Sequence, residues 1–253
     1  TNMYLTSLKP HTIKCRKHHK EIIMRQKTLF CTLFVTSVLG LCACQAINIK
    51  TEVSKQEARW YNLKDFEGVD SIGTNPYDLE FDIAYSGIDG DMVQVKNCLE
   101  VSSLGDSKIA EREFARWDLL KIDCEAAKRF YDAPEKAVNH WPSIFDLSLL
   151  KTFPSTSTPY LGGQGLDGRS GNLAEHESTL TLIESGEHSV KVSYDGMIVN
   201  YVVVARGDFN RDSYQDLFMR MDWYIEGSFG DGHDWVVLTK TSPNAAPLML
   251  WRK

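Results

Sequence analysis

The stretch Ser-Val-Lys-Val-Ser-Tyr-Asp-Gly-Met-Ile-Val-Asn-Tyr-Val-Val-Val-Ala, residues 189–205, decides the fold of the C-terminal part of this chain. Apolar and polar side chains alternate from Ser189 to Tyr194, which is the period of a half-buried β-strand. Asp195-Gly196 follows, and this dipeptide favours a two-residue type I′ turn. Residues 197–205 then return as a second strand. The sequence therefore predicts an antiparallel hairpin.

Further strand patterns flank the hairpin. Residues 179–183 precede it, and residues 235–239 and 248–251 follow it. Between them, alternate residues give one strand an apolar face, formed by Leu217, Met219, Met221, Trp223 and Ile225. We therefore expect residues 173–253 to form an antiparallel β-meander with an acidic loop between two of its strands.

The preceding region, residues 60–152, mixes strand and helix patterns. Residues 77–83 alternate as a strand, and residues 92–101 fit either a strand or a helix. Asp106 can cap a helix that follows at once. Its apolar stripe consists of Ile109, Ala110, Phe114, Trp117 and Leu120. We interpret this stripe as core rather than as a cofactor-binding surface.

A second helical piece is expected at residues 124–131, and Pro134 ends it. The whole pattern predicts an α+β fold, with an N-terminal mixed region and a C-terminal β-meander. Residues 153–172 separate the two and are rich in Pro, Ser and Gly. A loop of about 20 residues inside a domain is uncommon. It is either a linker or a flap over a site, and we favour a linker or flexible loop.

Residues 24–43 have the pattern of a signal peptide. Arg25 and Lys27 precede an apolar run, residues 29–43, which is short for a membrane span but suits a secretion signal. Residues 1–23 lie upstream of this pattern, and we exclude them from the mature protein.

The run ends in Leu41-Cys42-Ala43-Cys44, which resembles the lipobox of bacterial lipoproteins. The family prefers Ala, Ser or Thr where Cys42 stands. The resemblance implies that Cys44 is acylated, for example with palmitate, and becomes the mature N-terminus. Residues 44–59 would then tether the domain to the membrane. Gln45 after this cysteine implies an outer-membrane lipoprotein that faces the periplasm.

Two other outcomes stay open for this segment. Ordinary signal peptidase could cut after Ala46 and release a soluble secreted protein, or the segment could remain as a short membrane anchor.

Charge excludes one class of partner. Seven of the 28 Lys and Arg residues precede Cys44, but only one of the 34 Asp and Glu residues does. The mature chain therefore has 21 basic and 33 acidic residues, a net charge of −12. Such a surface repels phosphate backbones and anionic lipids, so we expect no nucleic-acid partner.

Two cysteines, Cys98 and Cys124, remain once the leader is removed and Cys44 is acylated. An even pair in an oxidising compartment predicts a disulfide. The alternative is two unpaired buried thiols. The sequence contains no Cys-x-x-Cys or Cys/His spacing for zinc.

A candidate calcium loop lies between two predicted strands. Its oxygen ligands would come from Asp208, Asn210, Asp212 and Asp216, and from the main-chain carbonyl of Tyr214. Ca²⁺ takes six to eight oxygen ligands, so the residue types are suitable. The spacing resembles the calcium loops of dockerin and of FG-GAP or VCBS-type β-repeats. That resemblance implies a structural ion rather than a catalytic one.

The loop departs from this pattern at two positions. Ser213 stands where those loops carry Gly, and Met219 stands where an EF-hand has its bidentate Glu, so a helical EF-hand is excluded. The alternative is a metal-free connection in which Asp and Asn side chains satisfy the main chain.

No catalytic set can be assembled from spacing alone. His176, between Glu175 and Glu177, suits acid–base chemistry but also a solvated loop, and Asp231, His233 and Asp234 form a second acidic patch. We therefore expect a non-catalytic binding or structural module of the cell envelope, with its protein or envelope partner unknown. The alternatives are an envelope hydrolase with a site between the two regions, and a secreted inhibitor-like binding protein.

Overall fold

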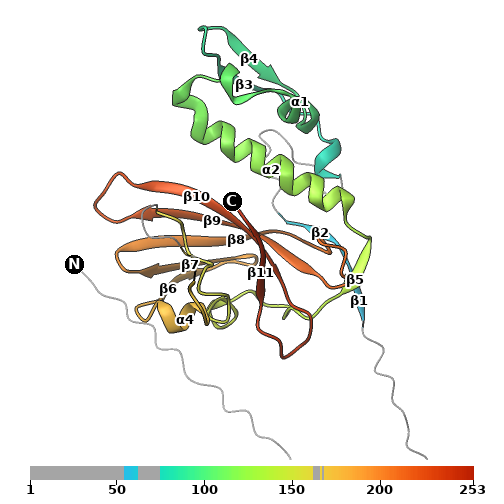
Figure 1. Ribbon diagram of the computed structural model, residues 1–253, viewed down its shortest axis with the longest axis vertical. Helices are drawn as coiled ribbons and strands as arrows, with labels where there is room; N and C mark the ends of the chain where they lie inside the picture. Colours follow the sequence, from blue (N-terminus) through green and yellow to red (C-terminus); the bar gives the residue numbers. More distant parts are fainter. Residues whose placement is uncertain (1–53, 62–74, 162–165, 167) are drawn as a thin grey trace, which may run out of the picture. The chain divides into compact units, whose positions relative to one another are not determined.

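The computed structural model describes residues 54–61, 75–161, 166 and 168–253 (Figure 1). The predicted signal peptide, Cys44 and residues 44–53 of the tether lie outside these residues. In the described part of the chain, no helix has the length and apolar character needed to cross a membrane.

The fold is α+β, as the sequence predicts, and its largest element is an antiparallel meander. The strands follow one another in the order β11-β10-β9-β8-β7-β6 (Figure 1). A short strand, β2 (Arg59–Trp60), also pairs with β8. The bounds of the meander strands are β6 Thr181–Ser185, β7 Ser189–Tyr194, β8 Met197–Gly207, β9 Asp216–Ile225, β10 Asp231–Thr239 and β11 Leu248–Arg252.

The β7–β8 hairpin has the predicted turn. Asp195 and Gly196 have φ angles of 50° and 75°, and both signs are those of a type I′ turn. Tyr194 pairs with Met197 directly across it. This turn fixes the register from which the rest of the meander extends.

A β-bulge in β8 changes the face of the sheet to which the following side chains of this strand point. Val203 pairs with Met219, but Ala205, rather than Val204, pairs with Phe218. One inserted residue turns every later side chain to the opposite face. Arg206, opposite Leu217, consequently lies on the same face as Val203 and Met219.

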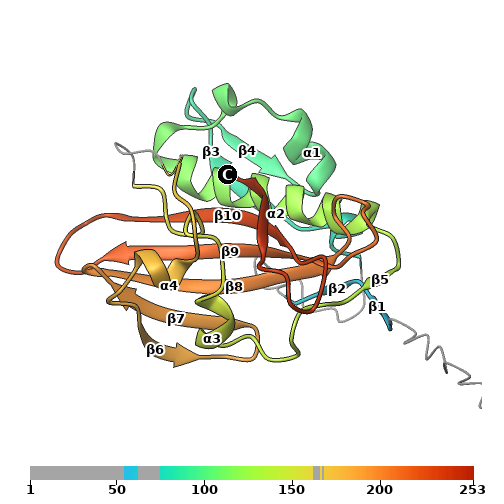
Figure 2. The same cartoon turned by 60° about the horizontal axis from the view of Figure 1, so that its bottom comes forward.

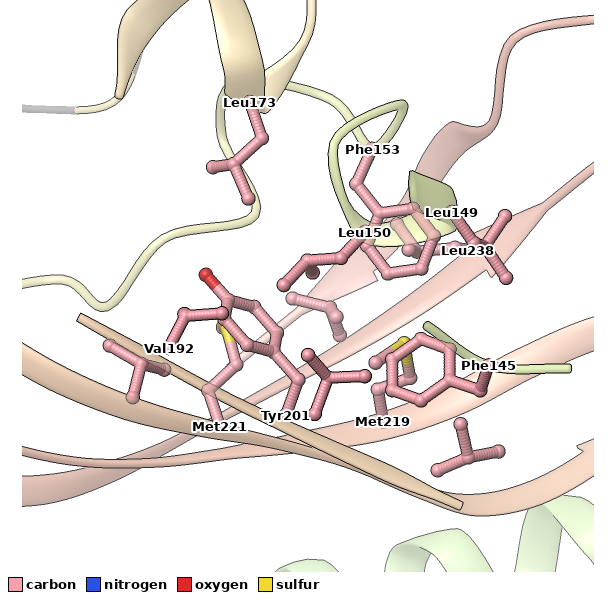
Figure 3. Close-up of a cluster of buried hydrophobic side chains, with 14 of the residues drawn as sticks. Phe145, Leu149, Leu150, Phe153, Leu173, Val192, Tyr201, Met219, Met221 and Leu238 are labelled. Atoms are coloured by element: carbon pink, nitrogen blue, oxygen red, sulfur yellow. The ribbon is translucent and has the colours of Figure 1, made fainter. Parts of the chain in front are cut away.

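One face of the sheet is covered by the segment that leads into the Pro/Ser/Gly-rich loop. Trp141, Phe145 and Phe153 pack there with α3 (Leu147–Leu150) and α4 (Leu173–His176). Figure 3 shows Leu150 and Phe153 above Tyr201, Met219 and Met221 of the sheet, with Phe145 beside Met219. Two carbonyls of the predicted loop, those of Thr156 and Thr158, accept hydrogen bonds from Arg252 of β11, at 2.6 and 2.7 Å.

The opposite face of the sheet packs against α2 (Phe114–Asp132), which lies alongside it in Figure 2. Ile122 and Ala126 of this helix join Val204, Ala205 and Phe218 in one buried cluster. The bulge places both Val204 and Ala205 on this side.

The mixed region forms a separate cluster around α2, and a disulfide joins α1 to this helix. Cys98 in α1 (Cys98–Ser103) is bonded to Cys124 in α2, with Cα atoms 5.2 Å apart, which confirms the predicted bridge. The remaining elements are β1 Lys55–Glu57, η2 Pro76–Asp78, β3 Ile83–Ser86, β4 Met92–Val95, η3 Asp106–Lys108, η4 Glu111–Glu113 and β5 Lys136–Val138.

The helix prediction is wrong in its start and in its division. Asp106 does not cap α2, because its Oδ1 accepts hydrogen bonds from the Trp117 indole and the Lys121 ammonium, both at 2.8 Å. The helix begins eight residues later and runs without a break to Asp132. Phe114, placed in the core by the stripe, is exposed.

Two strand predictions in this region also shift. Asn75 accepts a hydrogen bond from the main chain of Tyr77, and the resulting turn η2 occupies the start of the predicted strand 77–83. Residues 92–101, open between strand and helix, contain both. β4 comes first, and Asn97 then caps α1 by accepting from Glu100 N–H.

Candidate functional site

The loop between β8 and β9 contains the predicted calcium ligands. Asp208 is buried, and its two carboxylate oxygens accept hydrogen bonds from the main-chain N–H groups of Asp212 and Ser213, at 2.9 and 2.8 Å. Asp212 in turn accepts from Tyr214 N–H at 2.9 Å. The loop is therefore closed by its own Asx-type hydrogen bonds.

Asn210 and Asp216 complete this network. The Asn210 amide donates to Asp212 Oδ2 and its oxygen accepts from Asp212 N–H, at 2.9 and 3.1 Å. Asp216, fully buried at the start of β9, accepts from Phe209 N–H at 2.8 Å. Burial raises the pKa of Asp216 to about 7, an effect that the Thr239 hydroxyl across on β10 partly offsets.

The sharp bend that the resemblance requires is formed without glycine. Ser213 stands at the usual Gly position and has φ of 76°, and Arg211 has φ of 62°. Both residues adopt the left-handed conformation, which costs an L-residue about 1–2 kcal/mol. The loop thus makes its bend at the cost of local strain.

The oxygen donors of this loop suit Ca²⁺ in kind, but most of them already serve the main chain. An oxygen that accepts one hydrogen bond keeps a second lone pair, so Asp208, Asp212 and the Tyr214 carbonyl could still act as ligands. Among the described residues, however, no group of three or more His, Cys, Asp or Glu side chains is arranged to hold a metal ion. Calcium binding stays a prediction.

The His140 ring lies 5.4 Å from the Tyr214 ring of this loop, whereas His176 and His233 have other partners. His176 is exposed and its Nε2 lies 2.7 Å from the Ser170 carbonyl, while His233 Nδ1 contacts Asp222 Oδ1 at 2.6 Å. In the β9–β10 register Thr239 lies opposite Asp216, whereas Asp231 lies opposite Tyr224. The second acidic patch is therefore at the other end of these strands from the Asp208 loop.

A small pocket lies beside the described part of the Gly-rich loop. It has a volume of about 230 Å³ and is lined by Tyr160, Arg169, Glu177 and Tyr194, among others. Glu177 is paired with Arg169 at 3.3 Å. Neither His176 nor His233 is among the lining residues.

A second pocket, which the sequence did not predict, lies along β8 at the point where its pairing partner changes from β7 to β2. The His188 carbonyl accepts from Val203 N–H at 2.8 Å, and Tyr61 N–H donates to the next carbonyl, that of Val204, at 2.9 Å. The segments that contain β7 and β2 thus meet end to end along β8, and a pocket of about 630 Å³ lies at this junction. Its lining consists of Lys55, Gln56, Glu57, Arg59, Tyr61, Lys136, Ser143, Glu187, His188, Arg206 and Gln215.

Arg206 is the deepest charged group of this pocket. Its side chain reaches the lining because the bulge turns it onto the apolar face of the sheet, where only 8% of the residue is exposed. It has no carboxylate partner among the described residues, its Nε has no hydrogen-bond partner, and Nη1 reaches only the Pro142 carbonyl at 3.5 Å. Burial, with a smaller effect from Arg59, lowers the pKa of the Arg206 guanidinium.

Gln215 provides an unpaired acceptor in the same lining. It is 2% exposed, and its amide nitrogen donates to the carbonyls of Gln56 and Glu57 at 3.2 and 2.9 Å. These two bonds fix the orientation of the amide. Its oxygen has no hydrogen-bond partner in the part of the chain that the structure describes.

The rim of the pocket is basic, in contrast to the acidic chain. Lys55, Arg59 and Lys136 outnumber Glu57 and Glu187. Among the described lining residues, the Lys136 ammonium lies 3.7 Å from Glu57 and the His188 ring lies 3.6 Å from Glu187. With Arg206 the lining has four Lys and Arg side chains and two carboxylates.

An aromatic pair forms one wall. The Tyr61 and His188 rings lie 3.9 Å apart between centroids, and the Arg206 guanidinium lies 6.0 Å from the Tyr61 ring. Burial lowers the pKa of the His188 imidazole, so this ring is neutral at neutral pH.

No family model, curated protein or solved structure matches this chain.

Proposed function

We propose that this chain is a lipid-anchored binding module of a bacterial cell envelope, and that its ligand enters the pocket between β1, β2 and β8. The proposed binding role rests on this pocket. A volume of about 630 Å³ lies in the range of small-molecule sites.

The two buried polar atoms favour binding over a purely structural role. Buried donors and acceptors are nearly always paired in folded proteins, because an unpaired one costs about 1–3 kcal/mol. Arg206 Nε and Gln215 Oε1 are both unpaired within the described residues and both belong to residues that line one pocket. A ligand that pairs them recovers this free energy on binding.

The envelope location rests on the N-terminal sequence. The basic residues before the apolar run and the Leu41-Cys44 motif support acylation of Cys44, and Gln45 supports the outer membrane. The Cys98–Cys124 disulfide agrees with an oxidising compartment such as the periplasm. In this role a Ca²⁺ ion in the Asp208 loop would hold β8 to β9 rather than take part in chemistry.

Metabolic labelling with radioactive palmitate tests the anchor. The wild-type chain is expected to take up label and sediment with outer membranes, whereas Cys44→Ala is expected to take up none. An intact mass that starts beyond Cys44 without a lipid would contradict the proposal.

A further inference from the structure

We propose that the pocket lined by Arg206 and Gln215 binds a small organic carboxylate that also carries a hydroxyl group. The inference names the ligand class of the proposed binding role and depends on that role, but not on the lipid anchor.

The charge of the ligand follows from Arg206. A guanidinium presents five N–H donors in a planar fork that matches the two oxygens of a carboxylate. Here only 8% of the residue is exposed, its Nε is unpaired, and no carboxylate of the described residues meets the guanidinium. Arg252, on the same sheet, shows the usual arrangement, because its guanidinium pairs with Asp234 at 2.6 Å. A carboxylate from outside the chain would complete Arg206 in the same way.

The hydroxyl of the ligand follows from Gln215. Its amide oxygen accepts hydrogen bonds only, and its orientation is fixed by the two carbonyls that its nitrogen reaches. A simple inorganic oxyanion in its fully ionised form brings acceptors alone and leaves this oxygen unpaired. Because both residues line the same pocket, we expect a ligand with a hydroxyl donor beside its carboxylate to pair with Gln215 as well as with Arg206.

The surroundings agree with an anion of this size. Lys55 and Arg59 stand at the rim without ion-pair partners among the described residues, so they can attract an anion to an otherwise acidic chain. The Tyr61 and His188 rings, in contact at an interplanar angle of 42°, provide an aromatic wall for the carbon skeleton.

The test is calorimetric titration of the full chain with glucuronate, with glucose and inorganic phosphate as separate arms. Glucose has a similar size and the same ring hydroxyl groups, but carries a CH2OH group in place of the carboxylate. The variants are Arg206→Met and Arg59→Gln, and the control is Arg112→Gln, which replaces an exposed arginine of η4 far outside the lining.

We expect glucuronate to bind and glucose to bind at least tenfold more weakly. Arg206→Met should weaken glucuronate binding by about 10- to 100-fold, as for the loss of a hydrogen-bonded charge. Arg59→Gln should weaken it less, and Arg112→Gln should not change it. If Arg206→Met does not fold, Arg59→Gln and the glucose arm still decide the result.

Three results would overturn the inference: no glucuronate binding, equal binding of glucose, or equal affinity in Arg206→Met. Phosphate binding in place of glucuronate would leave a binding role but reject the organic carboxylate. Absence of palmitate label from the wild-type chain, by contrast, would reject the lipid anchor and leave this site unaffected.

Discussion

Replacing Arg206 by Met is expected to stabilise the ligand-free protein. The residue is buried, its Nε is unpaired within the described part of the chain, and its single hydrogen bond, to the Pro142 carbonyl, is 3.5 Å long. Removing such a group recovers about 1–3 kcal/mol of desolvation cost. Met keeps the length of the aliphatic stem and its contacts with the sheet.

The loss on the other side is small. The guanidinium lies 6.0 Å from the Tyr61 ring, and a cation–π contact at this distance contributes about 0.5–1 kcal/mol. The net expectation is a gain of about 1 kcal/mol in the free energy of unfolding. For a chain of this size that corresponds to a rise of roughly 2–4 °C in Tm.

The matched contrast is Arg252→Met. Arg252 pairs with buried Asp234 and donates to two carbonyls, so its removal leaves a buried carboxylate without a cation. Breaking such a pair costs about 3–5 kcal/mol. Urea denaturation of both variants, beside the wild type and in a buffer without organic acids, measures the two signs. A loss of 1 kcal/mol or more in Arg206→Met would refute the reasoning, because it would show that Arg206 already has a stabilising partner.

The remaining predictions concern the disulfide, the Asp208 loop and the end of β9. Replacing Cys98 and Cys124 by Ser should lower the free energy of unfolding by about 3.5 kcal/mol, because the bridge closes a separation of 26 residues; equal free-thiol counts with and without reductant would contradict the bridge itself. Ser213→Gly should raise stability by about 0.5–1 kcal/mol, since φ of 76° is strained for Ser, and an unchanged or lower urea midpoint would contradict that strain. If Ca²⁺ occupies the loop, an excess of 100 times its Kd should stabilise the wild type by about 2.7 kcal/mol relative to EGTA and leave Asp208→Ala/Asp212→Ala unchanged, whereas no difference would make the loop metal-free. Burial alone would raise the pKa of Asp222, but the hydrogen bond with His233 and the Arg220 guanidinium outweigh it and hold the pKa below its usual range. A carboxyl whose pKa is lowered in the folded state stabilises the fold above the unfolded pKa of about 3.9, and this stabilisation is lost as the pH falls through the folded pKa. Asp222→Asn should therefore flatten the acid limb of the stability–pH curve. A variant curve identical to that of the wild type would contradict this expectation.

The sequence predicted the elements that short-range chemistry determines. Asp195-Gly196 fixed the hairpin because few dipeptides tolerate two positive φ angles, and period-two alternation located the strands around it. The Cys98–Cys124 pair followed from cysteine number and compartment. These signals are local or compositional, so no tertiary information was needed.

The sequence failed where a distant contact competes with a local preference. Asp106 has the residue type of a helix cap, but the Trp117 indole and the Lys121 ammonium compete for its carboxylate. The pocket was missed for a related reason. Arg206 directly follows an apolar run, and a charge at the end of a buried strand was a usable signal. The face of the sheet on which Arg206 lies, however, depends on a bulge at Val204, and no local sequence pattern predicts this bulge.

The most direct test of the account is the side-chain Nε–H resonance of Arg206, measured by NMR in ¹⁵N-arginine-labelled protein and assigned by its disappearance in Arg206→Lys. The account predicts that glucuronate shifts this resonance and slows exchange of its proton with water, because the buried Nε gains an acceptor, and that glucose leaves it unchanged. An Arg206 resonance that glucuronate does not alter, in a protein that is folded, would contradict the proposed site.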